Sequence, residues 1–199
     1  MHIPSRIAAR MLLCCAVAAA PALAFAQDAA PAKPAKPAVG TAMSPSETYG
    51  KLLGMMEKEF VDAAEAMPAD KFDFAPPATA GDFKGVRTFG GQVKHVTEAN
   101  LYFFGGGGMS EADMKAKADA IEKLTAKADI IQALKDSFTQ AHTYVNGITP
   151  ENVFVMTANG TRAGMSTFGI SHMMDHYGQM VVYLRMNGIV PPASRGGGM

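Results

Sequence analysis

Apolar residues recur every three or four positions along most of this chain, the spacing that places side chains on one face of an α-helix. Four long segments show this pattern, and no stretch alternates apolar and polar residues as a half-buried strand does. The pattern predicts an all-α fold, for which a four-helix bundle is the simplest architecture. The predicted helices cover residues 44–67, 88–104, 130–147 and about 166–187.

Short signals mark the ends of these helices. Ser44-Pro45-Ser46-Glu47 predicts a capping box at the start of the first helix, and Pro68 marks its end. Thr88 is expected to cap the second helix, which stops at the glycine run 105–108. Gly147 ends the third helix.

Two connecting segments are long. Residues 70–87 contain Pro76, Pro77 and two glycines, so we expect no regular structure there, but a loop of this length is expected to pack on the domain. Residues 110–125 open with a capping signature but carry only a thin apolar stripe. They predict a short, peripheral helix.

The first 26 residues have the layout of a secretory signal peptide. Arg6 and Arg10 precede an apolar run that ends at Phe25, and Ala24-Phe25-Ala26 resembles a cleavage site. The run is shorter than the roughly 20 residues of a membrane-spanning helix. We therefore expect no stable membrane anchor and an exported protein, periplasmic or secreted after cleavage.

The expected mature chain divides into three parts. Residues 27–43 form a linker rich in proline, alanine and lysine, which lacks the apolar side chains needed for folding. Residues 195–199 form a short tail that is expected to be disordered. The intervening residues 44–194 are enough for one domain with a substantial core.

Charge and cysteine content exclude several classes of function. The 18 basic residues equal the 18 acidic residues, and loss of the leader's two arginines leaves a net charge of −2, so nucleic acid is not an expected partner. Both cysteines, Cys14 and Cys15, lie in the leader. The mature protein is therefore expected to contain no disulfide, thiolate nucleophile or sulfur-ligated metal.

Candidate chemistry centres on His172 and His176. Residues four apart on a helix are neighbours on its surface, so both imidazoles are expected to point the same way. Met165, Phe168, Gln179 and Tyr183 share their face by helical spacing, and this face is predicted to turn into the bundle. Two buried imidazoles need polar partners, and a single metal ion is one way to provide them.

His95 is the best candidate for a third ligand, because it lies in the middle of the second predicted helix. Three imidazoles with open coordination positions describe a reactive metal site. The alternative is that these histidines are core or boundary residues that bond to water or backbone. His142 is expected to be a partly exposed residue near the end of its helix.

The stretches FDFAPPATAGDFKGVRTFGGQVKHVTEANLYFF and SHMMDHYGQMVVYLRMNGIVPPAS resemble the DinB-like (DinB/YfiT) superfamily of metal-binding four-helix bundles. In that family one histidine comes from the second helix and a His-x-x-x-His pair from the last, which implies His95, His172 and His176 as ligands. The resemblance also implies a long crossover between helices two and three, for which residues 105–125 are available. Known relatives include transferases and isomerases that use cytoplasmic thiols, a cofactor class that an exported protein would not meet.

Nitrogen ligands favour a divalent transition metal, with zinc first and nickel or iron as alternatives. Zinc held by three protein ligands lowers the pKa of bound water toward about 7, which suits hydrolysis or activation of a nucleophile. Glu98 is the candidate general base, although a solvated role is the more common one for such a residue. Asp175 is expected to face solvent, while Gln179 and Tyr183 line a pocket or pack in the core.

Two functions follow from this combination. The first is a metal-dependent hydrolase or transferase that acts on a small molecule. The second is a non-catalytic protein that binds a metal or ligand in a helical scaffold. A fold and a ligand set do not specify a reaction, so both stay open, as does a homodimer.

Overall fold

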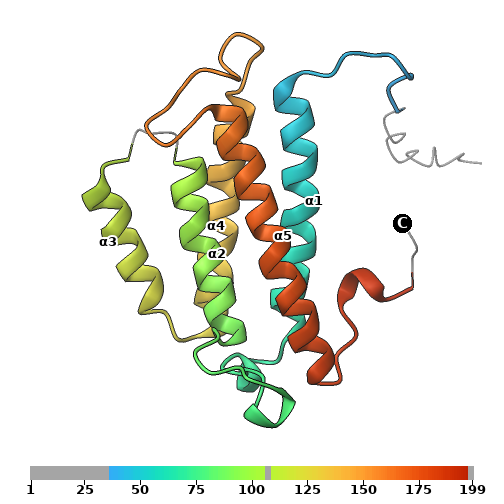
Figure 1. Ribbon diagram of the computed structural model, residues 1–199, viewed down its shortest axis with the longest axis vertical. Coiled ribbons are helices and arrows are strands. Elements are labelled where there is room, and N and C mark those ends of the chain that lie inside the picture. The colour runs from blue at the N-terminus through green and yellow to red at the C-terminus, as the bar shows by residue number, and fades with distance from the viewer. Residues whose placement is uncertain (1–35, 106–108, 197–199) are drawn as a thin grey trace, which may run out of the picture. The chain divides into compact units, whose positions relative to one another are not determined.

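The computed structural model describes residues 36–105 and 109–196, in which five α-helices and no strands occur. Figure 1 shows the helices in chain order. They are α1 (Pro45–Ala66), α2 (Phe89–Phe104), α3 (Glu111–Glu122), α4 (Lys127–Asn146) and α5 (Arg162–Met186), with short 3₁₀ turns at Ala69–Lys71, Ala78–Ala80 and Pro192–Ser194. The all-α prediction is confirmed. The helix that is additional to the four long ones is α3, and its residues are those that were expected to form a short, peripheral helix.

Side-chain caps explain where four of the helices begin. Ser44 accepts from the Glu47 amide while its own amide donates to the Glu47 carboxylate, so the predicted capping box is present. The Thr88 hydroxyl accepts from the Gly91 amide to cap α2, and the Ser110 hydroxyl accepts from the Asp113 amide to cap α3. At α5, Thr161 accepts from the Gly164 amide at 3.0 Å.

The last helix begins earlier than expected. It starts at Arg162 rather than near Ser166, because Thr161 supplies the cap. The expectation that its face carrying Phe168 turns inward is also wrong at that residue. Phe168 is 61% exposed, whereas Met165 and Tyr183 are buried.

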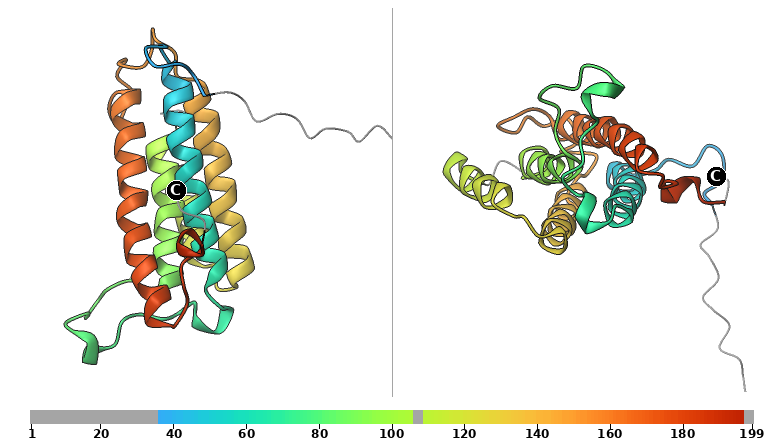
Figure 2. Two further views of the ribbon diagram at one scale, coloured as in Figure 1. Left: turned by 90° about the vertical axis from the view of Figure 1, so that its right-hand side faces the viewer. Right: turned by 90° about the horizontal axis from the view of Figure 1, so that it is seen from below.

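Four helices surround the hydrophobic core. α1 packs against α4 and α5, and α2 packs against the same two helices. Figure 2 shows these four seen along their length, with α3 outside them beside α2. The core side chains come from all four helices and include Leu53, Phe60, Phe89, Phe138 and Leu184.

The segment between α1 and α2 packs on the domain, as its length predicted. Phe72 is buried and meets the Phe89 ring edge-on at 5.4 Å. The Phe72 and Phe74 carbonyls accept from the Gly90 and Phe89 amides at 2.7 and 2.8 Å. These bonds satisfy amides at the α2 N-terminus and hold the helix that carries His95.

Of the described residues, 42–196 belong to one compact unit and 36–41 belong to another. In the shorter segment the Thr41 amide donates to the Ala38 carbonyl. The predicted signal peptide and most of the predicted linker lie outside the described residues, as do the last three residues of the tail. Among the helices that the structure describes, no stretch combines the length and apolar character needed to cross a bilayer.

Candidate metal centre

The structure brings the three predicted ligands together at the seam between α2 and α5. His95 projects from α2, and His172 and His176 project from successive turns of α5. The Nε2 atom of His172 lies 3.2 Å from Nε2 of His95 and 3.2 Å from Nε2 of His176. The ligand nitrogens of all three residues lie within 4.8 Å of one another.

These separations fit a shared metal ion. Two nitrogens bound to zinc at the tetrahedral angle lie about 3.3 Å apart, given the usual Zn–N length. Neutral imidazoles are also the donors that zinc, nickel and iron accept well. The donor set and its spacing therefore suit a divalent transition metal. His176 is 6% exposed, while His95 and His172 are half-buried, so one side of the centre faces solvent.

A chain of amide side chains orients His176. Its Nδ1 atom lies 2.6 Å from Oε1 of Gln92, which is buried in α2. Gln92 in turn donates through Nε2 to Oε1 of Gln179 at 2.8 Å, and Gln179 donates to the Asp175 carboxylate at 3.3 Å. Because Gln92 Oε1 only accepts, His176 carries its proton on Nδ1, which leaves Nε2 free to bind a metal.

His172 is held differently. Its Nδ1 atom is buried and has no hydrogen-bond partner among the described residues. The Phe103 ring packs beside the imidazole, with centroids 5.4 Å apart. Apolar packing thus positions His172, in contrast to the polar chain behind His176.

All three histidines are uncharged at neutral pH. Burial, together with the neighbouring imidazoles His172 and His95, lowers the pKa of His176 to about 4. Burial and the positive charge of Arg87 lower the pKa values of His95 and His172, although Asp175 acts in the opposite direction on His172. Neutral imidazoles are the form that binds metal, so no proton has to leave before binding at pH 7.

Glu98 lies one turn after His95 on α2 and is half-buried, so the interpretation that it is a solvated residue is wrong. Burial and the neighbouring Glu122 carboxylate raise the pKa of Glu98 to about 7. Glu122 stays ionised because Lys94 donates to it at 3.0 Å, which lowers the pKa of Glu122. A carboxyl group that is half-ionised near neutral pH therefore stands on the same helix as His95.

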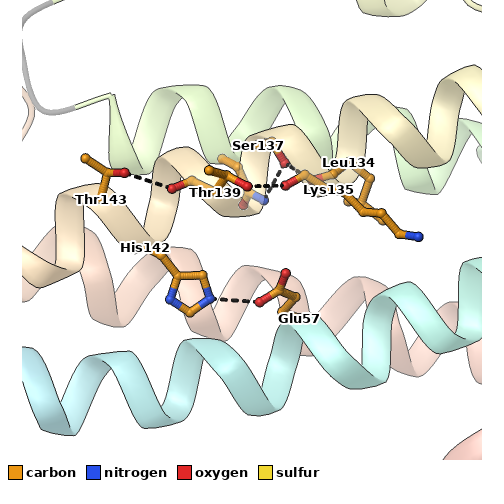
Figure 3. A network of polar contacts seen from close by, with 8 residues as sticks. Glu57, Leu134, Lys135, Ser137, Thr139, His142 and Thr143 are labelled. Atoms are coloured by element: carbon orange, nitrogen blue, oxygen red, sulfur yellow. Dashed lines mark hydrogen bonds and ion pairs between the residues drawn. The ribbon is translucent and has the colours of Figure 1, made fainter.

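The other candidates have separate surroundings. Asp175 is exposed, as expected. Tyr183 is 5% exposed and donates to the Arg87 carbonyl at 3.2 Å, so it packs in the core. His142 is partly exposed near the end of α4, and its Nε2 lies 2.8 Å from Oε2 of Glu57 on α1 (Figure 3).

Two residues that support the centre were not predicted from the sequence, Gln92 and Gly169. Gln92 precedes His95 by three positions, but a glutamine in a helix has no distinctive pattern. Gly169 lies on α5 against α2, and a Cβ atom there would lie 2.6 Å from the Phe104 ring and 3.0 Å from Cβ of Phe103. The only available signal was a glycine inside an otherwise strong helical pattern.

The geometry agrees with a comparison against known proteins. A family model described as DinB family matches residues 55–197, more than half of the chain and all three histidines. No curated protein matches the chain.

Proposed function

Because the chain belongs to the DinB family, we propose that it binds one divalent transition metal through His95, His172 and His176 and acts as a metal-dependent hydrolase or transferase on a small molecule. The convergence of three Nε2 atoms, two of them 3.2 Å from the third, is the observation that carries this proposal. Zinc is the first choice of metal, with nickel or iron as alternatives. When bound, the ion supplies Lewis-acid chemistry at its open positions.

The chain's own residues account for proton transfer. We assign Glu98 the role of general base, since a pKa of about 7 lets it accept a proton from a nucleophile at neutral pH. Its buried Oε1 atom has no partner among the described residues. The Glu122 carboxylate, which Lys94 keeps ionised, repels negative charge on Glu98 and so favours the protonated form of Glu98. Gln92 keeps His176 in one tautomer throughout.

The half-exposed state of His95 and His172 supports an enzyme over a sealed binding protein, because a substrate can reach that side of the centre. The alternative, a non-catalytic protein that holds a metal or ligand, uses the same three residues. Turnover of a hydrolase or transferase substrate panel, measured with and without the ion and in Glu98→Gln, separates the two. Metal binding without turnover on any substrate identifies the non-catalytic protein.

Two further parts of the proposal concern architecture and location. We assign α1, α2, α4 and α5 to a four-helix bundle and residues 105–125, which include α3, to the crossover; the packing of α3 mainly against α2 among these helices supports this. We also propose export to the periplasm or beyond, on the leader-like residues 1–26. Mass spectrometry of the mature protein should find Gln27 as its first residue.

Elemental analysis tests the metal site directly. The purified protein should contain about one transition-metal ion per chain, and His176→Ala should lose most of it because one ligand is removed. His142→Ala is the matched control, since this histidine bonds to Glu57 outside the centre and should leave the metal content unchanged. Equal metal content in the protein and in His176→Ala would refute the site.

A further inference from the structure

A strip of aromatic rings leads away from the three histidines along the seam between α2 and α5. The Phe103 ring packs beside His172 at a centroid distance of 5.4 Å. Tyr102 and Phe168 each meet Phe103 edge-on, at 5.3 and 5.1 Å. The strip therefore consists of one buried ring, Phe103, and two further rings that each contact it.

The outer rings of this strip lie on the same sides of their helices as the histidines. Tyr102 follows His95 by two turns on α2, so the two share one side of that helix. Phe168 precedes His172 by one turn on α5 and shares its side in the same way. Gly169 brings α5 close to Phe103 and Phe104, because no side chain intervenes. The buried ring of the strip, Phe103, therefore stays next to the imidazole of His172.

The outer rings are exposed although their neighbours are not. Phe168 is 61% exposed and Tyr102 is 48% exposed, whereas Phe103, which both rings contact, is 6% exposed. Two rings offer too little area for a stable protein interface, which buries about 800 Å² on each partner. They do match the size of one flat apolar group in a small molecule.

We propose that Tyr102 and Phe168 form the specificity surface of the candidate metal centre and hold the aromatic part of a small substrate whose donor atom binds the ion. This inference rests on the proposed metal site and names the class of substrate for it. An aromatic ring beside Phe168 gains edge or stacking contacts that an aliphatic group cannot make. The two residues are specificity determinants and take no part in proton transfer.

Two hydroxamic acids that share the metal-binding group but differ in their substituent test the assignment. Benzohydroxamate carries an aromatic ring, and acetohydroxamate carries only a methyl group. In calorimetric titration of the zinc-loaded protein, benzohydroxamate should bind about tenfold more tightly. Phe168→Ala and Tyr102→Ala should each weaken benzohydroxamate roughly three- to tenfold and leave acetohydroxamate within about twofold.

Unchanged affinity for acetohydroxamate also shows that each variant still folds and holds its metal. Phe154→Ala is the matched control, because this 77% exposed ring lies in the loop before α5 and outside the strip. It should change neither affinity. Equal affinities for the two hydroxamates in the unaltered protein, or an aromatic preference that survives both substitutions, would overturn the specificity surface alone. Failure of the protein to retain zinc or bind either hydroxamate would overturn the metal site and this inference with it.

Discussion

Gln92 decides which nitrogen of His176 is free. Its Oε1 atom accepts from Nδ1 of His176, and its amide group is fixed by Gln179. We expect Gln92→Ala to lower zinc affinity about 10- to 100-fold, because the imidazole loses the bond that sets its tautomer and orientation. Competition with a chelator of known affinity measures this change. Gln132→Ala, an exposed glutamine on α4, serves as the control, and equal affinities in the two variants would contradict the role of Gln92.

Glu98 makes stability depend on pH in a specific direction. Its pKa rises from an ordinary 4.5 to about 7 in the folded protein, so the folded state holds a proton that the unfolded state releases. This contribution is complete below pH 4.5 and is lost as the pH rises through about 7. Removal of the ionisable group should therefore change the stability of the folded protein only at alkaline pH.

We expect Glu98→Gln to raise the melting temperature by about 2–4 °C at pH 8 and to leave it nearly unchanged at pH 4.5. Calorimetric melting at the two pH values checks this, and each protein at low pH is its own control. A rise of the same size at both pH values would show that ionisation of Glu98 is not the cause. The same substitution should abolish turnover if Glu98 is the general base.

At the scale of elements, Gly169 sets the approach of α5 to α2. Alanine at this position would meet the Phe104 ring and Cβ of Phe103 inside a packed core. We expect Gly169→Ala to destabilise the protein by about 1–3 kcal/mol, since overpacking outweighs the better helix propensity of alanine. Urea unfolding measures the difference.

Gly178 provides the matched control on the same helix. A Cβ atom there meets nothing within 4 Å, so Gly178→Ala should stabilise the protein by up to about 1 kcal/mol through helix propensity alone. A stabilising effect of Gly169→Ala similar to that of Gly178→Ala would show that the seam has room for a methyl group.

The elements themselves were largely predictable. Ser44, Thr88 and Ser110 act as caps in the structure as their sequence context indicated. The start of α5 was missed because Thr161 follows an Asn-Gly loop, and a lone threonine there does not stand out as a cap. The exposure of Phe168 was missed because helical spacing groups residues on a face but does not say where that face leaves the core.

At the scale of the whole molecule, metal binding and folding should be coupled. The three ligands come from two helices that are far apart in sequence, so only the folded chain presents them together. A metal held at 100 times its dissociation constant stabilises the folded state by about 2.7 kcal/mol. We therefore expect a chelator to lower the melting temperature by roughly 5–10 °C.

His176→Ala should melt at the same temperature with and without chelator, because it holds little metal to remove. His142→Ala should respond to chelator as the unaltered protein does. If chelator leaves the melting temperature of the unaltered protein unchanged, a bound ion does not stabilise the folded state.

The sequence by itself determined the class of the fold and the pair His172 and His176, while the choice of His95 also needed the family resemblance. Both depend on local regularities: a period of 3.6 residues, capping side chains, and an i, i+4 pair that one helix must present together. Tertiary structure alone decided the rest. The Gln92 bond to His176, the burial that raises the pKa of Glu98, and the contact of Phe103 with His172 each join or cover side chains from separate helices. Such properties depend on how helices pack, and no spacing within one helix encodes them.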